Sequence, residues 1–334
     1  MEQTDEILVK EYRGGVLENV HRGRICGVGA DKRVHIRVGD MDMPTFWRSC
    51  AKPIQAIPRV MRGIDERLSF SEAETAITLS SHRGEAGHIE TLESLMQKSG
   101  LQEAMLACGS AYPANSAARE NLLKRQAPPR PIYHNCSGKH FGVLTLCKQM
   151  GWPLDSYWDI SHPAQQEIIR MLLRMSECSP HEMHVATDGC GFPVTAMPLK
   201  NLATAYLKLA CPELIEDEAV RAAVVNITNA MNREHWLVSG TGRITSVFLQ
   251  DENIVAKDGA KGVYCFGLKR EKLGFAFKVS DGSDQAWPYI ITAILTQIGY
   301  ANEKTIAELQ KFAPPEIKND NGKIVGEVQT VFRI

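Results

Sequence analysis

The sequence predicts an α+β fold in which both ends of the chain build one antiparallel sheet and the middle builds a mainly helical part. Two observations lead to this prediction. Residues 1–45 and 240–334 contain short runs of β-branched and apolar residues separated by turn residues. Residues 46–239 mainly carry apolar side chains three and four positions apart, which is the helical period. We therefore expect residues 1–334 to form a single unit, with helices flanking the sheet and filling the insertion.

The strands at the start of the chain are predicted from residue type and alternation. Arg33–Val38 alternates polar and apolar residues over six positions, as a half-buried strand does, and Gly39 follows it. Ile7–Val9 and Val16–Val28 carry β-branched residues next to glycine pairs. These three segments are expected to begin the sheet.

The helices in the middle of the chain are predicted from their caps and their periodicity. Ser71 to Glu74 forms a capping box, which should open a helix that runs to about Ser80. The Pro-rich run 127–131 is the best linker candidate. Further helices are expected at Glu85–Lys98, Ala118–Arg125, Gly138–Met150, His162–Met175, Val194–Leu209 and Glu216–Met231, with a short strand at His184–Thr187.

The last third of the chain is predicted to return to the sheet. Its apolar runs are short and separated by turn residues, and one longer helical pattern lies behind them. The expected order is strands at Ile244–Gln250, Asn253–Lys257, Gly262–Gly267 and Gly274–Ser280, a helix at Asp284–Ile298, a weak helix, and a strand at Lys323–Ile334.

Composition favours a soluble protein with a small-molecule partner. Hydrophobic residues make up 44% of the chain, and 38 basic residues nearly balance 39 acidic ones. No run of Lys or Arg exceeds two residues, which argues against nucleic acid as a partner. No apolar stretch approaches the length of a membrane span, and the acidic start lacks the apolar core of a secretion signal. The nine cysteines are an odd number, so we expect a cytoplasmic protein without a disulfide framework.

A nucleophile is suggested by the segment Ser49-Cys50-Ala51-Lys52, the one Ser-x-x-Lys in the chain. Residues three apart on a helix share a face, so the two side chains can meet. A lysine can take the serine proton only as a neutral amine, so burial or a nearby cation must lower its pKa. Ser49 at a helix start would also have free N–H groups beside it. The alternative is a helix-capping Ser49 with a solvated Lys52.

Two further clusters are chemically suggestive. Ser81 to His88 places a hydroxyl, two imidazoles and a carboxylate around a helix start, although Ser81 could simply cap that helix. Lys257 lies two residues before Gly259, at the end of a late strand. A Lys-x-Gly after an earlier Ser-x-x-Lys follows the order of the penicillin-recognising enzymes. An ordinary hairpin turn with exposed lysines is the alternative.

Together these segments resemble the L-asparaginase II family, the rhizobial-type asparaginases with a serine-β-lactamase-like fold. The resemblance runs in family order from about residue 10 to residue 330. The matching segments are Arg48–Pro53, Ser81–His88, His134–His140, Asp188–Pro193 and Ala256–Ala260.

The resemblance implies that the protein deamidates L-asparagine to L-aspartate and ammonia through an acyl-enzyme. Ser49 then matches the nucleophile and Lys52 its base, while Ser81 and Lys257 match a second Ser–Lys pair. It also implies a homodimer. A related serine glutaminase or a β-lactamase-like hydrolase is the alternative enzyme. A catalytically silent protein that binds zinc or an amino acid is the alternative of another class. The residues expected to bind substrate are Arg48, His82 and Glu85.

A metal site is a further expectation. Cys136 and Lys139 lie three apart, while Asp188 and Cys190 lie two apart near a strand end and so share a face. Two thiolates and a carboxylate are credible Zn²⁺ ligands. The resemblance implies that these four residues hold zinc, which would organise substrate binding and not activate the nucleophile. Lysine must bind as a neutral amine, so nearby histidines, His134 and His140, are alternative nitrogen ligands.

One residue departs from the family pattern. The family often has glutamate after the Gly-Ala that follows Lys257, whereas this chain has Lys261 there. A second cation could lower the pKa of Lys257 or change the substrate pocket. The departure affects the expected substrate more than the expected reaction class.

Overall fold

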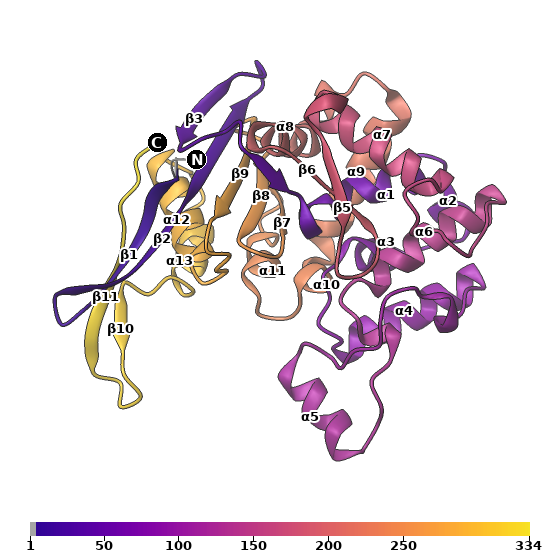
Figure 1. Cartoon of the computed structure of the whole chain (residues 1–334), viewed down its shortest axis with the longest axis horizontal. Helices are drawn as coiled ribbons and strands as arrows, with labels where there is room; N and C mark the ends of the chain where they lie inside the picture. Colours follow the sequence, from indigo (N-terminus) through magenta and orange to yellow (C-terminus); the bar gives the residue numbers. More distant parts are fainter. Residues whose placement is uncertain (1–4) are drawn as a thin grey trace.

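The two ends of the chain build one antiparallel sheet, which confirms the predicted α+β architecture. The computed structural model describes residues 5–334, so Met1–Thr4, the start of the predicted sheet-rich part, lie outside the described residues. The strand order is β10-β11-β1-β2-β9-β8-β7, and β3 pairs with β2. Figure 1 shows this sheet at one end of the molecule and the helical part at the other. The strands are β1 (Glu6–Arg13), β2 (Val16–Gly29), β3 (Val34–Val38), β7 (Ile254–Asp258), β8 (Val263–Leu268), β9 (Leu273–Val279), β10 (Glu316–Lys318) and β11 (Ile324–Thr330).

Helices pack on both faces of the large sheet. Gly267 on β8 pairs with Gly274 on β9, and α8 (Leu199–Ala210) crosses directly over this pair. A Cβ at Gly274 would lie 2.3 Å from the carbonyl oxygen of Ala203, so glycine lets this helix approach closely. Tyr264 belongs to the opposite face, where its ring meets Trp287. That face is covered by α11 (Ile244–Phe248), α12 (Trp287–Gln297) and α13 (Glu303–Gln310).

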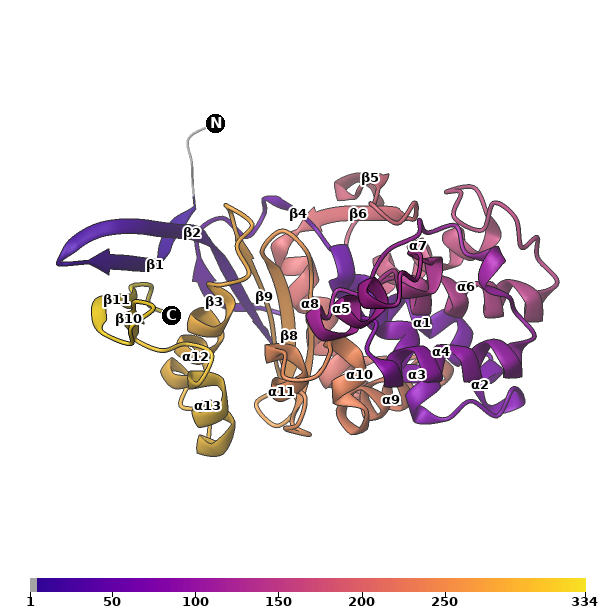
Figure 2. The same cartoon turned by 90° about the horizontal axis from the view of Figure 1, so that it is seen from below.

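The helical part surrounds the buried helix α1 (Lys52–Val60), all of whose residues are buried. The predicted capping box is present: Ser71 Oγ accepts from the Glu74 N–H, and Glu74 accepts from the Ser71 N–H. Figure 1 shows α5 at the lower edge of the molecule, outside the helices that pack around α1, and Figure 2 gives the view from below. The remaining helices are α2 (Ile64–Arg67), α3 (Glu72–Leu79), α4 (Ala86–Ser99), α5 (Ser116–Lys124), α6 (Ser137–Met150), α7 (Pro163–Ser176), α9 (Glu218–Arg233) and α10 (His235–Ser239).

Two predicted elements are wrong. The expected strand Ile244–Gln250 is the short helix α11, because Ile244 and Phe248 lie four apart and are both buried on one helical face. The expected helix from Val194 begins only at Leu199. The preceding residues form β6 (Pro193–Pro198), which pairs with β4 (Pro44–Phe46) and β5 (His184–Thr187) in a second, three-stranded sheet.

The edge strand β7 meets the helical part next to the Ser-x-x-Lys segment. Cys50 Sγ lies 3.1 Å from the carbonyl oxygen of Lys257 on β7. The hydroxyl of Tyr206 on α8 donates to the carbonyl oxygen of Cys50 at 2.9 Å. These two contacts fix the residue that follows Ser49 between the sheet and α8.

The described residues include no helix that is both long and apolar enough to cross a membrane.

Candidate active site

The Ser-x-x-Lys segment lies on a short turn of helix that leads into α1. The turn η1 (Arg48–Ala51) begins with Arg48 in the left-handed region, at φ 47°. A non-glycine residue in this region is strained and is common at functional turns. Ser49 is half-buried on this turn, while Lys52 is the first residue of α1 and is 2% exposed.

The amine of Lys52 is buried and surrounded by hydrogen-bonding oxygens. Its Nζ lies 2.5 Å from the carbonyl oxygen of Ser80 and 3.4 Å from that of Asn135. It also lies 3.1 Å from Ser81 Oγ. A neutral amine can donate its two protons to the two carbonyls, which leaves its lone pair for a serine hydroxyl. The structure therefore brings the predicted residues Lys52 and Ser81 together.

The surroundings of Lys52 favour the neutral amine. Burial is the main cause that lowers the pKa of Lys52. The positive charges of Lys257 and Lys139 lower it further, against an opposing effect of Cys136. The sequence-based requirement for a lowered pKa at Lys52 is thus met in the structure.

The predicted substrate residues His82 and Glu85 are engaged within the protein. His82 Nδ1 accepts from the Gly84 N–H at 3.2 Å, so Nε2 carries the proton and donates to Ser137 Oγ at 2.8 Å. Glu85 accepts from the hydroxyl of Thr241 at 2.6 Å and so fixes the loop after α10. Their contacts support the Ser81 segment, and their role in substrate binding stays a prediction.

Lys257 has a carboxylate partner that sequence reasoning missed. Its Nζ lies 2.8 Å from Asp258 Oδ1, and the Lys257 side chain is fully buried. Neighbouring residues in a strand normally point to opposite faces, so the sequence gives no signal for this pair. Ser81 contacts Lys52 instead, and the proposed Ser81–Lys257 pair stays a prediction. Lys261 is exposed in the turn after β7.

Three of the four predicted metal ligands converge behind this site. Lys139 Nζ lies 3.0 Å from Cys190 Sγ, and the side chains of Cys190 and Cys136 are close neighbours. The neighbouring Cys190 side chain and the positive charge of Lys139 hold the pKa of Cys136 well below its usual range. Burial alone would lower the pKa of Lys139, but Cys136 and Cys190 outweigh it and raise that pKa.

The fourth predicted ligand points elsewhere. Asp188 Oδ1 lies 2.9 Å from Arg48 Nη2, so a predicted metal ligand pairs with a predicted substrate residue. In keeping with this, no three His, Cys, Asp or Glu side chains of residues 5–334 are grouped to hold a metal ion. The donor chemistry of Cys136, Lys139 and Cys190 fits zinc. Asp188 would have to break its ion pair with Arg48 to become the fourth zinc ligand.

The alternative nitrogen ligands are placed differently. His140 Nδ1 lies 2.6 Å from the Tyr157 hydroxyl, and its ring packs on Phe192 at 4.1 Å between centroids. His134 Nδ1 accepts from the N–H of Cys136 at 3.1 Å. His140 is thus engaged elsewhere, whereas His134 lies next to Cys136 and stays an alternative to Lys139 as the nitrogen ligand.

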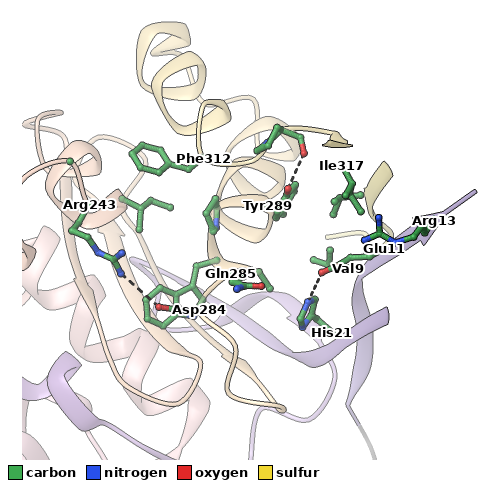
Figure 3. Close-up of a pocket in the computed structure, with 17 residues that line it drawn as sticks. Val9, Glu11, Arg13, His21, Arg243, Asp284, Gln285, Tyr289, Phe312 and Ile317 are labelled. Atoms are coloured by element: carbon green, nitrogen blue, oxygen red, sulfur yellow. Dashed lines mark hydrogen bonds and ion pairs between the residues drawn. The ribbon is translucent and has the colours of Figure 1, made fainter. Parts of the chain in front are cut away.

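A larger cavity than those around Lys52 lies away from these residues. It measures about 440 Å³ and is built between β1, β11 and the start of α12. Figure 3 shows Arg243 and Asp284 at one end and His21, Glu11 and Arg13 at the other. None of the predicted catalytic or metal residues lines it. The two cavities that touch Lys52 are much smaller, at about 10 Å³ each.

Comparisons with known proteins match nearly the whole chain to one family. The family model described as L-asparaginase II matches residues 9–330. The search of curated proteins found no match. Solved structures similar to this chain include a putative β-lactamase from Bacteroides dorei, with 15% identity, a TM-score of 0.43 and coverage of 82% of this chain and 93% of that one. A class C β-lactamase from Rhodobacter sphaeroides has 14% identity and a TM-score of 0.43, with coverage of 82% of this chain and 95% of that one. A Bacillus glutaminase has 12% identity and a TM-score of 0.39, with coverage of 84% of this chain and 92% of that one.

Proposed function

Because the chain belongs to the L-asparaginase II family, whose model matches residues 9–330, we propose that the protein hydrolyses L-asparagine to L-aspartate and ammonia. Family membership assigns it to the amidohydrolases. The finer proposal is supported by one observation in particular. The buried Lys52 amine, three residues after Ser49, lies 3.1 Å from the Ser81 hydroxyl, and two carbonyl oxygens can accept its protons.

Acylation follows from this arrangement. The lone pair of neutral Lys52 takes the proton of Ser49, directly or through the Ser81 hydroxyl at 3.1 Å. Ser49 Oγ attacks the side-chain amide carbon of asparagine, and the proton passes to the leaving ammonia. An ester between Ser49 and the aspartyl group remains, which water then hydrolyses. The start of α1 beside Ser49 favours the negative charge that develops on the carbonyl oxygen.

The substrate assignment is tested by ammonia release from a panel of amides. We expect asparagine to give the highest kcat/KM, with glutamine lower. Preference for glutamine would replace the proposal by a serine glutaminase. Absence of ammonia release from every amide would instead favour a catalytically silent protein.

Activity is expected to rise with pH. Lys52 accepts a proton only when neutral, so kcat/KM should increase as pH rises through its pKa. Because burial lowers that pKa, the rise should be complete at mildly alkaline pH, below the range of an ordinary lysine. The measurement is kcat/KM for asparagine from pH 5 to pH 10, with initial rates of ammonia release. A maximum in acid would contradict a lysine base and point to Glu85 or Asp188.

Zinc is proposed as a separate, supporting component. Cys136, Lys139 and Cys190 would hold it, with Asp188 as the fourth ligand, and it would supply positive charge that orders the substrate side of the pocket. The nucleophile and its base, Ser49 and Lys52, lie outside this donor set.

Metal removal is expected to raise KM while turnover at saturating asparagine remains measurable. Cys190→Ala should have the same effect as chelation, whereas Ser49→Ala should still bind zinc. Elemental analysis of both variants, combined with kinetics, checks this division. A folded, metal-free protein without activity at saturating asparagine would show that the metal takes part in the chemistry. Purified wild-type protein that never binds zinc would remove the site from the proposal.

A further inference from the structure

A small cavity lies directly behind the nucleophile. Its walls come from η1 and α1, which supply Ser49, Lys52 and Gln55, and from β6, which supplies Thr195. The charged side chains of Arg48, Lys139 and Asp188 complete the walls, so the cavity adjoins the proposed zinc ligands. Its volume is about 10 Å³. That is close to the least space that holds a single water molecule, roughly 10–15 Å³. The cavity is therefore too small for a substrate and large enough for one water.

Polar atoms without partners surround this cavity. Gln55 Oε1, Thr195 Oγ1 and Trp47 Nε1 are buried, and within residues 5–334 none of them has a hydrogen-bond partner. The three residues line the cavity and are 9%, 3% and 0% exposed. Buried polar groups are nearly always paired, and ordered water is the usual partner where protein groups are missing.

The three atoms offer what one water needs. The indole N–H of Trp47 is a donor, the amide oxygen of Gln55 is an acceptor, and the Thr195 hydroxyl can be either. Buried waters typically make about three such bonds. A water held by these groups would also lie beside the base Lys52 and the ester carried by Ser49.

We propose that this cavity binds the water that hydrolyses the acyl-enzyme, and that Gln55 and Thr195 are the positioning residues that orient it. The inference rests on the proposed Ser49 acyl-enzyme. In this step the water oxygen attacks the ester carbon, and the Lys52 amine takes the proton that the water loses. The bond between the carbonyl carbon and Ser49 Oγ then breaks, and Lys52 returns the proton to Ser49. The products are the aspartate side-chain carboxyl group and the free serine hydroxyl.

The first test removes the Thr195 hydroxyl and keeps the shape of the side chain. In Thr195→Val, deacylation should become the slow step, and kcat should fall about 10- to 100-fold. Ammonia should then appear as a burst of one equivalent per subunit, because acylation precedes the slow step. Intact-mass spectrometry during turnover should show the aspartyl adduct on the variant. Thr195→Ser, which keeps the hydroxyl, should restore kcat and remove the burst.

Two further variants separate the proposed role from a structural one. Gln55→Leu should show the same burst and adduct as Thr195→Val. Thr292→Val removes a buried, unpartnered hydroxyl on α12 that does not line the cavity, and should change neither kcat nor the adduct.

The outcomes that overturn the inference are distinct. A lower kcat in Thr195→Val and Gln55→Leu without burst or adduct would show a structural role for these residues. Unchanged kcat in both variants would exclude a hydrolytic water held by Gln55 and Thr195. Full activity in Ser49→Ala, with no adduct in any variant, would overturn the inference through failure of the proposed acyl-enzyme itself.

Discussion

Replacement of Ser49 by alanine is expected to lower kcat by at least about 10³-fold, because removing a catalytic nucleophile leaves only binding and charge stabilisation. The fold should survive. Ser49 is half-buried on η1, and alanine fits the same turn with one oxygen fewer. Ammonia release at saturating asparagine measures the loss, and the thermal unfolding midpoint checks the fold. Ser161→Ala, an exposed serine in front of α7, is the matched control and should keep wild-type kcat.

The structure supplies a definite rival for the nucleophile. Ser81 Oγ lies 3.1 Å from Lys52 Nζ and so has the direct contact expected of an activated hydroxyl. If Ser49→Ala kept even a tenth of wild-type turnover while Ser81→Ala lost it, Ser81 would be the nucleophile. In the proposed mechanism Ser81 carries a proton, so Ser81→Ala should reduce kcat less than Ser49→Ala does.

Much of the fold could be predicted because local patterns and tertiary packing agree. The capping box at Ser71 and the alternation of Arg33–Val38 both give the observed elements. The strand predicted at residues 244–250 is wrong because a short apolar run between turn residues fits a strand or a short helix, and packing buries Ile244 and Phe248 four apart on a helix. At Val194 the sequence shows helical spacing, but pairing of β6 with β4 and β5 takes precedence as far as Pro198.

The site was less predictable because its contacts join distant segments. Sequence spacing could bring Ser49 and Lys52 together, since they lie one helical turn apart. It could not show that Ser81 would contact Lys52, nor that Asp188 would pair with Arg48 across 140 positions. Contacts of this kind depend on how the helices and β6 pack around α1, and no local periodicity encodes them.

The polar atoms without partners around the small cavity could not be predicted from the sequence, for a related reason. Gln55 and Thr195 are ordinary residues in a helix and a strand, and neither belongs to a motif. Their significance comes from burial without a partner next to Ser49. Residues that position a water are recognised by geometry, whereas those that form bonds to substrate are often recognised by residue type.

Replacement of Lys52 by methionine is expected to be nearly as damaging as the loss of Ser49, with kcat lower by at least about 10²-fold. Methionine keeps an unbranched side chain that is one atom shorter and removes the amine, so the serine hydroxyl has no base. Kinetics from pH 5 to pH 10 should show that alkaline pH does not rescue the variant, because the group whose deprotonation produced the rise is gone. Lys208→Met, a buried lysine on α8 that donates to the Arg174 carbonyl, is the matched control and should keep the wild-type pH profile.

Thermal unfolding distinguishes loss of the base from loss of the fold. Burying an amine is costly, so removal of the Lys52 amine should leave the unfolding midpoint near the wild-type value even though two carbonyls lose a donor. Lys52→Arg adds a complementary test, since a guanidinium stays protonated and cannot accept the serine proton. Both variants should therefore be folded and nearly inactive. If Lys52→Met retained the alkaline rise in kcat/KM, the titrating base would be another group. Lys257, a fully buried lysine whose carbonyl oxygen contacts Cys50 Sγ, would be the next candidate.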